Sequence, residues 1–270
     1  MSVLITFIKL IAVFDLLVIA VYFGGDILST MLNIDYQVAV IIVAVVVTVY
    51  SIMGGLWSVT LTDFVQVFLI VIGMIIAVPF AMNYAGGWSS ISANIPEGTM
   101  NLFEGYDLFG IISLVIMYTA TFSVGQEAVS RFYAAKDEKA AKGGAWLAAL
   151  INFIYAFIPT ILGIITLALI NMGKFSSEQF ASVGARYALP VLAINTMPAL
   201  ICGLLFAGII SATMSSSDSD LLGAGSIFAN DIYKAVLKPD ASSESVMKVT
   251  KIVMLSLIHI SEPTRRRGIS

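Results

Sequence analysis

The sequence has very little cysteine, histidine or charge. Its one cysteine, Cys202, cannot form an internal disulfide or a thiolate metal cluster, and its one histidine is His259. Charged residues make up 11% of the chain, against about 25% in an average soluble domain. Nucleic-acid binding is not expected, because the sequence has no basic stripe that would follow a phosphate backbone.

The region around His259 is expected to be foreign to the protein. Leu255 to Arg265 reads LSLIHISEPTR, which resembles the in-frame translation of a transposase-type sequencing-library adapter. Residues 255–270 are therefore interpreted as non-native and excluded from fold reasoning, the alternative being a genuine helix that ends in a polar tail. Residues 1–254 then contain no histidine. Histidine acid–base catalysis and histidine metal sites are excluded there, and no enzyme activity is expected.

What the sequence has in abundance is apolar residues, grouped in long blocks. Hydrophobic residues make up 59% of the chain, and the mean hydropathy is +0.97. A helix needs about 20 apolar residues to span the hydrocarbon core of a bilayer. Blocks of about this length occur at 3–32, 37–53, 58–82, 108–134, 144–171 and 196–230, and another begins near 246. They are continuously apolar, without the two-residue alternation of barrel strands, and so predict transmembrane helices.

These blocks predict an all-α, multi-pass protein of the cell membrane, with residues 1–254 forming its transmembrane core. The first block is too long for the apolar part of a signal peptide, and no small-residue cleavage site follows it. No targeting segment is therefore expected, and the lipid bilayer is the expected surrounding of the chain.

One block carries a polar stripe. Ala212, Ser215, Ser216 and Ser219 follow the i, i+3, i+4, i+7 pattern, so they share one face of a helix. Hydroxyls and free backbone carbonyls are oxygen ligands that suit a sodium ion without burying several full charges. The stripe therefore indicates a sodium site, and hydrogen bonding between helices is the alternative.

Two carboxylates accompany the stripe. Asp218 and Asp220 fall on either side of it and not at its centre, because of their positions around the helix. A carboxylate inside a membrane helix is costly and usually faces a cavity or a partner. We expect these two residues to have a supporting role, either in ion entry or in helix contacts.

Three segments resemble the sodium:solute symporter family, which includes the sodium-coupled sugar, proline, pantothenate and sialic acid carriers. Ala207 to Tyr233, AGIISATMSSSDSDLLGAGSIFANDIY, resembles the family's eighth core helix. Tyr50 to Gln66, YSIMGGLWSVTLTDFVQ, resembles its signature at the turn between the fourth and fifth helices. Gly125 to Gly144, GQEAVSRFYAAKDEKAAKGG, resembles its sixth helix and the basic loop that follows. The segments occur in the family's order and spacing, and the resemblance covers core helices three to eight.

The resemblance implies a fold and a set of sodium ligands. The fold is the five-plus-five inverted repeat of LeuT-type transporters. The family's sodium site takes an alanine carbonyl and two hydroxyls from the eighth helix, which match Ala212, Ser215 and Ser216, and its remaining ligands come from the first helix. Some members hold a second sodium, and its ligands match Asp63 and Ser219, with Ser215 as a shared ligand.

The sequence departs from the two-sodium members at Asp218, where they carry a serine. An aspartate at this position has two interpretations. It could strengthen the attraction for the ion, or it could replace that ion with a salt bridge.

A polar interruption in the block 108–134 is the expected place for the solute. Thr121 to Gln126 reads TFSVGQ, and such a mixture of small and polar residues is typical of an unwound segment in a membrane helix. Phe122 and Gln126 are candidate substrate contacts, and the alternative is a plain helix with a glycine at a packing contact. The aromatic residues of the sugar carriers are not matched here, which argues against a sugar.

The function implied is sodium-coupled symport of a small organic solute by alternating access, with a monomer as the functional unit and Na⁺ as the coupling ion. The alternative is a transporter-like membrane module of a sensory signalling protein. The resemblance begins at the third core helix and ends as the ninth begins. The polypeptide as it stands is therefore expected not to transport.

Overall fold

The structure is a computed structural model that describes residues 3–101, 105–176, 180 and 187–261. Among these residues every regular element is a helix. The chain forms two compact units. Unit 1 comprises Met1–Ile70 and Phe206–Ser270, and unit 2 comprises Val71–Leu205.

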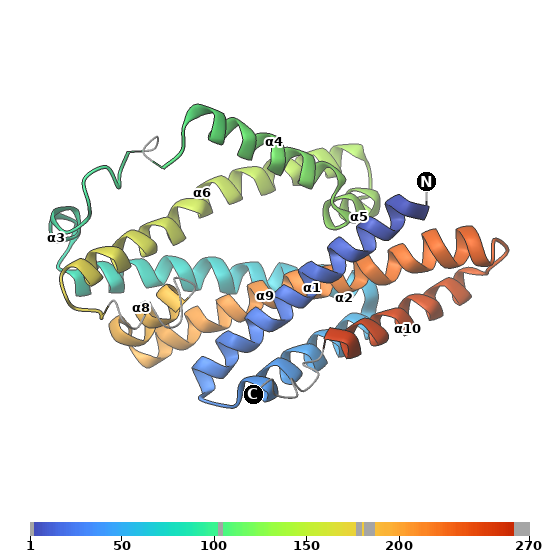
Figure 1. The fold of residues 1–270 in the computed structure, drawn as a ribbon, viewed down its shortest axis with the longest axis horizontal. Helices are drawn as coiled ribbons and strands as arrows, with labels where there is room; N and C mark the ends of the chain where they lie inside the picture. The colour runs from blue at the N-terminus through green and yellow to red at the C-terminus, as the bar shows by residue number, and fades with distance from the viewer. Residues whose placement is uncertain (1–2, 102–104, 177–179, 181–186, 262–270) are drawn as a thin grey trace, which may run out of the picture. The chain divides into compact units, whose positions relative to one another are not determined.

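Unit 1 contains both ends of the chain. Its elements are α1 (Val3–Leu32), the first part of α2 (Tyr36–Ala85), the later part of α9 (Ala199–Ile227), the π-helix η2 (Phe228–Leu237) and α10 (Ser243–Ser261). α10 packs against η2 and against α1, and these segments can be followed in Figure 1. Unit 1 thus brings together helices that are far apart in the sequence.

Unit 2 contains the middle of the chain. It holds the remainder of α2 and the start of α9, and between them α3 (Trp88–Ala93), α4 (Leu108–Val124), α5 (Gln126–Ala134), α6 (Glu138–Asn171) and α8 (Ala188–Thr196). α6 contacts both α3 and α8. The end of α6 is also tied to α3 by the Asn171 side-chain amide, which donates to the Asn94 carbonyl at 2.9 Å.

Within the described residues, four helical segments are long and apolar enough to cross a membrane. They are Leu4–Leu32, Tyr36–Ala85, Glu138–Asn171 and Ala199–Leu237. A bent pair, Leu108–Ser123 with Ala128–Ala134, would add a fifth crossing. Large apolar side chains on these helices are exposed, among them Trp57 (80%) and Phe153 (68%). Such a surface is unfavourable in water and suits lipid.

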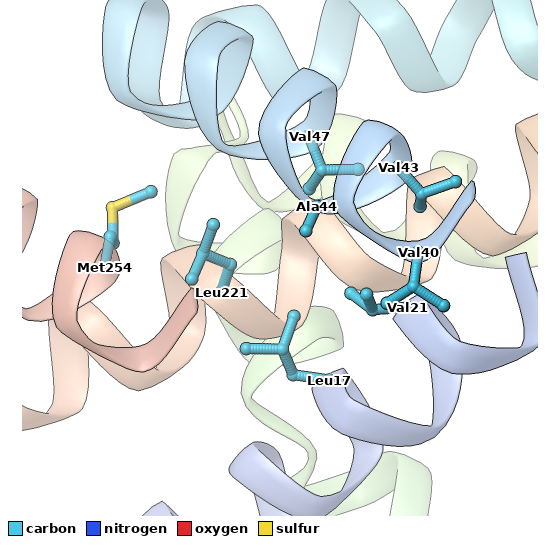
Figure 2. Packing of buried hydrophobic residues seen from close by; sticks show 8 residues of the cluster. All are labelled: Leu17, Val21, Val40, Val43, Ala44, Val47, Leu221 and Met254. Atoms are coloured by element: carbon cyan, nitrogen blue, oxygen red, sulfur yellow. The ribbon is translucent and has the colours of Figure 1, made fainter. Parts of the chain in front are cut away.

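The apolar core of unit 1 is built from four helices. Figure 2 shows its eight buried residues: Leu17 and Val21 of α1, Val40, Val43, Ala44 and Val47 of α2, Leu221 of α9, and Met254 of α10. The α2 members follow the i, i+3, i+4, i+7 pattern and so form one face of that helix. The core thereby fixes the first part of α2 against α1 and α9.

The sequence predicts two helices, 37–53 and 58–82, where the structure has the single element α2. Gly55 interrupts this element with φ 56° and ψ −145°. A positive φ of this kind is open to glycine and strained for other residues. A Cβ added at Gly55 would meet no atom within 4 Å. The backbone conformation, and not lack of space, therefore requires glycine here.

The predicted helix 108–134 is broken in the structure. α4 ends at Val124 and α5 starts at Gln126, because Gly125 between them is extended, with φ −61° and ψ 130°. The break lies in the polar segment in which the sequence predicts an unwound stretch.

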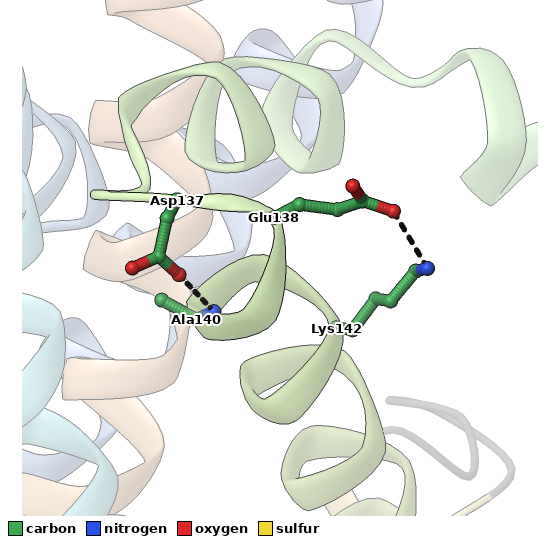
Figure 3. Close-up of polar contacts among 4 residues, drawn as sticks. All are labelled: Asp137, Glu138, Ala140 and Lys142. Atoms are coloured by element: carbon green, nitrogen blue, oxygen red, sulfur yellow. Dashed lines mark hydrogen bonds and ion pairs between the residues drawn. The ribbon is translucent and has the colours of Figure 1, made fainter.

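α6 begins at Glu138, six residues before the predicted start of the helix at 144. The reason is a polar first turn, which Figure 3 shows. The Asp137 carboxylate accepts from the Ala140 backbone N–H at 2.7 Å and caps the helix. Glu138 and Lys142 form an i, i+4 ion pair at 2.6 Å, with both side chains mostly exposed. An apolar block therefore marks the membrane segment and not the helix start.

The predicted helix 196–230 also has different ends. α8 ends at Thr196, and Met197 is extended with φ −119° and ψ 145°. Pro198 follows, and a residue before proline avoids the helical conformation. α9 therefore starts at Ala199, and after Ile227 the chain continues as η2.

The predicted helix that starts near 246 begins in the structure at Ser243 and ends at Ser261, as α10. The non-native origin of residues 255–270 stays a prediction. Residues 262–270 of that segment lie outside the described residues.

Gly55→Ala is expected to destabilise the protein by about 1–3 kcal/mol, because alanine must adopt the strained conformation found at Gly55. The measurement is the thermal unfolding midpoint of the purified protein in detergent. Gly163→Ala is the matched control, since a Cβ at this glycine of α6 also meets open space and its φ is not positive. An unfolding midpoint that falls no further for Gly55→Ala than for Gly163→Ala would contradict the assignment.

Candidate functional site

The polar stripe predicted from the sequence lies in the part of α9 that belongs to unit 1. α9 is continuous through these positions, so Ala212, Ser215, Ser216 and Ser219 share one face of the helix. Their burial differs along the stripe. Ser219 is 7% exposed, Ala212 and Ser215 are half-buried, and Ser216 is exposed. The stripe thus runs from the interior of unit 1 to its surface.

Asp63 of α2 lies against the stripe. The Ser215 hydroxyl donates a hydrogen bond to Asp63 Oδ1, and the Asp63 side chain is half-buried. These residues are 152 positions apart in the chain. Asp63 and Ser215 therefore form a direct polar link between α2 and α9.

Asp218 forms a second link between the same two helices. Its side chain is fully buried, at 0% exposure. The Tyr50 hydroxyl of α2 donates to Asp218 Oδ2 at 2.5 Å, and the Ser219 hydroxyl donates to Asp218 Oδ1 at 3.2 Å. The Tyr50 hydroxyl also lies 3.4 Å from the Met214 carbonyl oxygen. Each carboxylate oxygen of Asp218 therefore accepts a hydrogen bond from a hydroxyl.

The two carboxylates bond different serines of the stripe. The predicted ligands of a second sodium are Asp63 and Ser219, with Ser215 shared. In the structure, Ser215 bonds Asp63, whereas Ser219 bonds Asp218. Both carboxylates lie within electrostatic range of the Tyr50 hydroxyl. Asp63, Asp218 and the stripe thus belong to one polar cluster.

Three other hydroxyls in this part of α9 donate to backbone carbonyls and not to carboxylates. Ser217 donates to the Thr213 carbonyl at 2.8 Å, and Thr213 donates to the Ile210 carbonyl at 2.8 Å. Ser216 donates to the Ala212 carbonyl at a longer 3.3 Å. Such bonds return to the preceding turn of the same helix, as is common for serine and threonine in membranes. Ser215 and Ser219 instead donate to carboxylates, those of Asp63 and Asp218.

The hydroxyls that donate to carboxylates are suited to bind a cation. A serine hydroxyl has one hydrogen to donate and two lone pairs to accept with. When its hydrogen is bonded to a carboxylate, its lone pairs remain available for a positive ion. The set of hydroxyl, carbonyl and carboxylate oxygens is chemically suited to a hard cation. The described residues contain no group of three or more His, Cys, Asp or Glu side chains that could hold a metal ion.

Small residues let α2 and α9 approach each other closely beside this cluster. A Cβ at Gly208 would lie 3.0 Å from the Leu69 carbonyl oxygen and 3.2 Å from Ile70 Cα. Gly208 precedes Ser215 by seven residues and so lies on the same face of α9. The close backbone contact at Gly208 therefore holds the face that carries Ser215 against α2.

The predicted substrate residues lie in unit 2. Phe122 is on α4, is 65% exposed and stacks on Tyr118 with ring centroids 6.4 Å apart. The Gln126 backbone is the first residue of α5, and its side chain lies outside the described residues. The helix break at Gly125 separates these two residues. Of this pair, the structure therefore describes the side chain of Phe122 alone.

Sequence reasoning did not single out Tyr50 and gave Asp218 only a supporting role. Tyr50 opens the segment that resembles the family's signature, and Asp218 is a charged residue in the middle of an apolar helix. Both features indicate a polar contact. The two residues are 168 positions apart, however, and no local pattern in the sequence shows that they pair.

Comparison with known proteins identifies the family. The model of the "Sodium:solute symporter family" matches residues 1–262. The chain belongs to this family. The predicted membership is thus confirmed. This family consists of multi-pass membrane transporters and not of enzymes, as the sequence predicts.

Several characterised relatives share this similarity. The chain is 26% identical over 243 residues to "High affinity choline transporter 1" of Homo sapiens, covering 85% of the chain and 41% of the relative. It is 28% identical over 252 residues to "Sodium/glucose cotransporter" of Vibrio parahaemolyticus, covering 84% and 46%. It is 26% identical over 246 residues to "Sodium/proline symporter" of Staphylococcus aureus, covering 88% and 46%. The chain thus spans just under half the length of these relatives.

A solved structure confirms the predicted fold class. The match is a chain described as "Substrate-bound outward-open state of a Na+-coupled sialic acid symporter reveals a novel Na+-site", with a TM-score of 0.77 and 24% identity. It covers 95% of this chain and 56% of that one. The fold is therefore the predicted all-α, LeuT-type membrane fold.

Gly208→Leu is expected to destabilise the protein by about 1–3 kcal/mol, since the added side chain must displace the α2 backbone at Leu69. The thermal unfolding midpoint in detergent measures this effect. Gly203→Leu on the same helix is the control, because a Cβ there meets nothing within 4 Å. Equal midpoints for the two variants would contradict the close contact of α2 with Gly208.

Proposed function

We propose that the complete protein carrying this sequence is a sodium-coupled symporter for a small organic solute. The observation that carries the proposal is the hydroxyl stripe of α9, where Ser215 meets the Asp63 carboxylate of α2. The names of the relatives, which refer to choline, glucose and proline, support a small organic solute as the cargo.

The proposed sodium ligands on α9 are the Ala212 carbonyl oxygen and the Ser215 and Ser216 hydroxyls. Two features of unit 1 support this assignment. The three residues share one face of a continuous membrane helix, and Ser216 is exposed on that face, so its oxygen is accessible to an ion. The nearby Asp63 carboxylate adds a negative charge that lowers the cost of bringing a cation into the membrane.

Asp63 and Ser219 are proposed as ligands of a second sodium, with Ser215 shared between the two ions. Support comes from the polar cluster, because Ser215 bonds Asp63 and lies on the same face of α9 as Ser219. An oxygen that serves two ions is reasonable here, since the Ser215 hydroxyl retains both lone pairs when its hydrogen is donated to Asp63.

The proposed solute contacts are Phe122 and Gln126, on either side of the break at Gly125. A helix break frees backbone groups that can bind a solute, and the exposed Phe122 ring offers an apolar surface beside them. The variant Phe122→Ala tests whether the Phe122 side chain is required. The measurement is the concentration of solute that gives half-maximal uptake.

The proposed mechanism is alternating access by a monomer, driven by the inward sodium gradient. Sodium binding to α9 shifts the population towards the state that binds the solute, because the ion has a higher affinity for that state. Each sodium ion that moves inward down the membrane potential contributes about 2.3 kcal/mol per 100 mV. The strength of the coupling therefore depends on the difference in sodium affinity of the stripe between the two states.

Ser215→Ala and Ser216→Ala in the complete protein are each expected to abolish sodium-stimulated solute uptake, because each removes a proposed sodium ligand. The measurement is uptake into proteoliposomes with an inward sodium gradient, compared with the same potassium gradient. Candidate solutes are screened first with the unmodified protein.

Ser217→Ala is the matched control for both variants. It makes the same change on the same helix, but the Ser217 hydroxyl is bonded back to Thr213 of α9 and is not a proposed ligand. Uptake by Ser217→Ala is expected to keep its sodium dependence. Unchanged sodium dependence in Ser215→Ala and Ser216→Ala would contradict the sodium site.

A further inference from the structure

The buried carboxylate of Asp218 connects a tyrosine of α2 to one member of the stripe. Its Oδ2 atom accepts from Tyr50 at 2.5 Å, and its Oδ1 atom accepts from Ser219 at 3.2 Å. Asp218 is at 0% exposure and Ser219 at 7%. The Tyr50 hydroxyl, the carboxylate and the Ser219 hydroxyl thus form a chain of hydrogen bonds inside unit 1.

The direction of these bonds determines the orientation of the Ser219 hydroxyl. Both hydroxyls donate to the carboxylate, which has no hydrogen to give when it is ionised. Ser219 therefore directs its hydrogen towards Asp218, and the same oxygen can accept a cation through a lone pair. Without this acceptor, the serine hydroxyl would be expected to bond to a carbonyl of the preceding turn, as Ser217 bonds to Thr213.

Tyr50 fixes the carboxylate in this orientation. A carboxylate can rotate about its terminal bond, and a bond from a different helix restricts that rotation. The Tyr50 hydroxyl is near both Asp218 Oδ2 and the Met214 carbonyl, one turn before Asp218 on α9. The tyrosine is therefore held at a defined position along α9.

We propose that Tyr50 and Asp218 are positioning residues for sodium binding, which orient the Ser219 hydroxyl so that its oxygen faces the cation. The inference rests on the proposed function and deepens its second sodium site. Neither Tyr50 nor Asp218 contacts the ion in this account. They act as hydrogen-bonding partners of metal ligands do generally, by fixing the orientation of the ligand and raising its basicity.

The test is equilibrium binding of ²²Na⁺ to the complete protein, purified in detergent. Tyr50→Phe keeps the aromatic ring and removes only the hydroxyl. It is expected to raise the apparent Kd for ²²Na⁺ about tenfold, the lower end of the effect seen when a partner of a metal ligand is removed. Ser219→Ala removes the ligand and is expected to weaken binding at least as much.

The decisive comparison is the double variant Tyr50→Phe/Ser219→Ala. If Tyr50 acts through Ser219, its removal adds no further loss of affinity once Ser219 is alanine. A structural role of Tyr50 alone would give the same loss in both backgrounds, or a lower unfolding midpoint with an unchanged Kd. Asp218→Asn replaces one carboxylate oxygen by a donor and is expected to match Tyr50→Phe in ²²Na⁺ affinity.

Tyr22→Phe is the matched control. Tyr22 also lies in unit 1, and its ring packs against Tyr36 on the opposite side of the α1–α2 turn, so its hydroxyl can be removed with little change in ring packing. Its ²²Na⁺ affinity is expected to equal that of the unmodified protein.

Three outcomes overturn the inference. They are an unchanged affinity in Tyr50→Phe, an unchanged affinity in Ser219→Ala, and additive losses in the double variant. In each of these cases the proposed site of Ala212, Ser215 and Ser216 still stands. An unmodified protein that binds no ²²Na⁺ overturns the proposed function, and this inference with it.

Discussion

The hydrogen bonds between α2 and α9 are the interaction on which the candidate site depends. A carboxylate inside a membrane is costly unless its oxygens are satisfied. Asp63 and Asp218 accept hydroxyl hydrogens, from Ser215 in one case and from Tyr50 and Ser219 in the other. The same bonds that satisfy these carboxylates also orient the serine oxygens of the stripe. In the proposed sodium site, the stability of the helix pair and the ability to bind a cation would therefore have a common origin.

Backbone packing makes these bonds possible. A hydroxyl–carboxylate bond needs the two helices at a fixed separation, and small residues allow helices in a membrane to approach closely. Gly208 supplies this contact between α9 and the end of the unit 1 part of α2. The apolar core fixes the earlier part of α2 through Val40, Val43 and Val47. Tyr50 and Asp63 lie between these two contacts along the chain.

Much of this arrangement could be predicted from the sequence, since much of it is local. The apolar blocks predicted membrane helices, and the i, i+3, i+4, i+7 spacing predicted the stripe. The segment Tyr50 to Gln66, which resembles the family's signature at a helix turn, contains the interruption at Gly55. Helix ends were less predictable. α6 starts six residues earlier than its apolar block, because an aspartate cap and an ion pair are favourable in water as well as beside a membrane.

Contacts between distant residues were the part that local patterns could not supply. Asp63 entered the candidate site through the family resemblance alone, and its partner in the structure is Ser215. Tyr50 and Asp218 were not predicted to meet, since neither helical period nor residue type says which face of α2 lies against α9. The roles of Phe122 and Gln126 stay predictions, because the Gln126 side chain lies outside the described residues.

The most direct test of the sodium site is a pair of cryo-EM reconstructions of the complete protein, one in sodium and one in potassium buffer. The account predicts a density in sodium only, within coordination distance of the Ala212 carbonyl oxygen and the Ser215 and Ser216 hydroxyls. The same helix face without such a density in saturating sodium, or with an identical density in potassium, would contradict it.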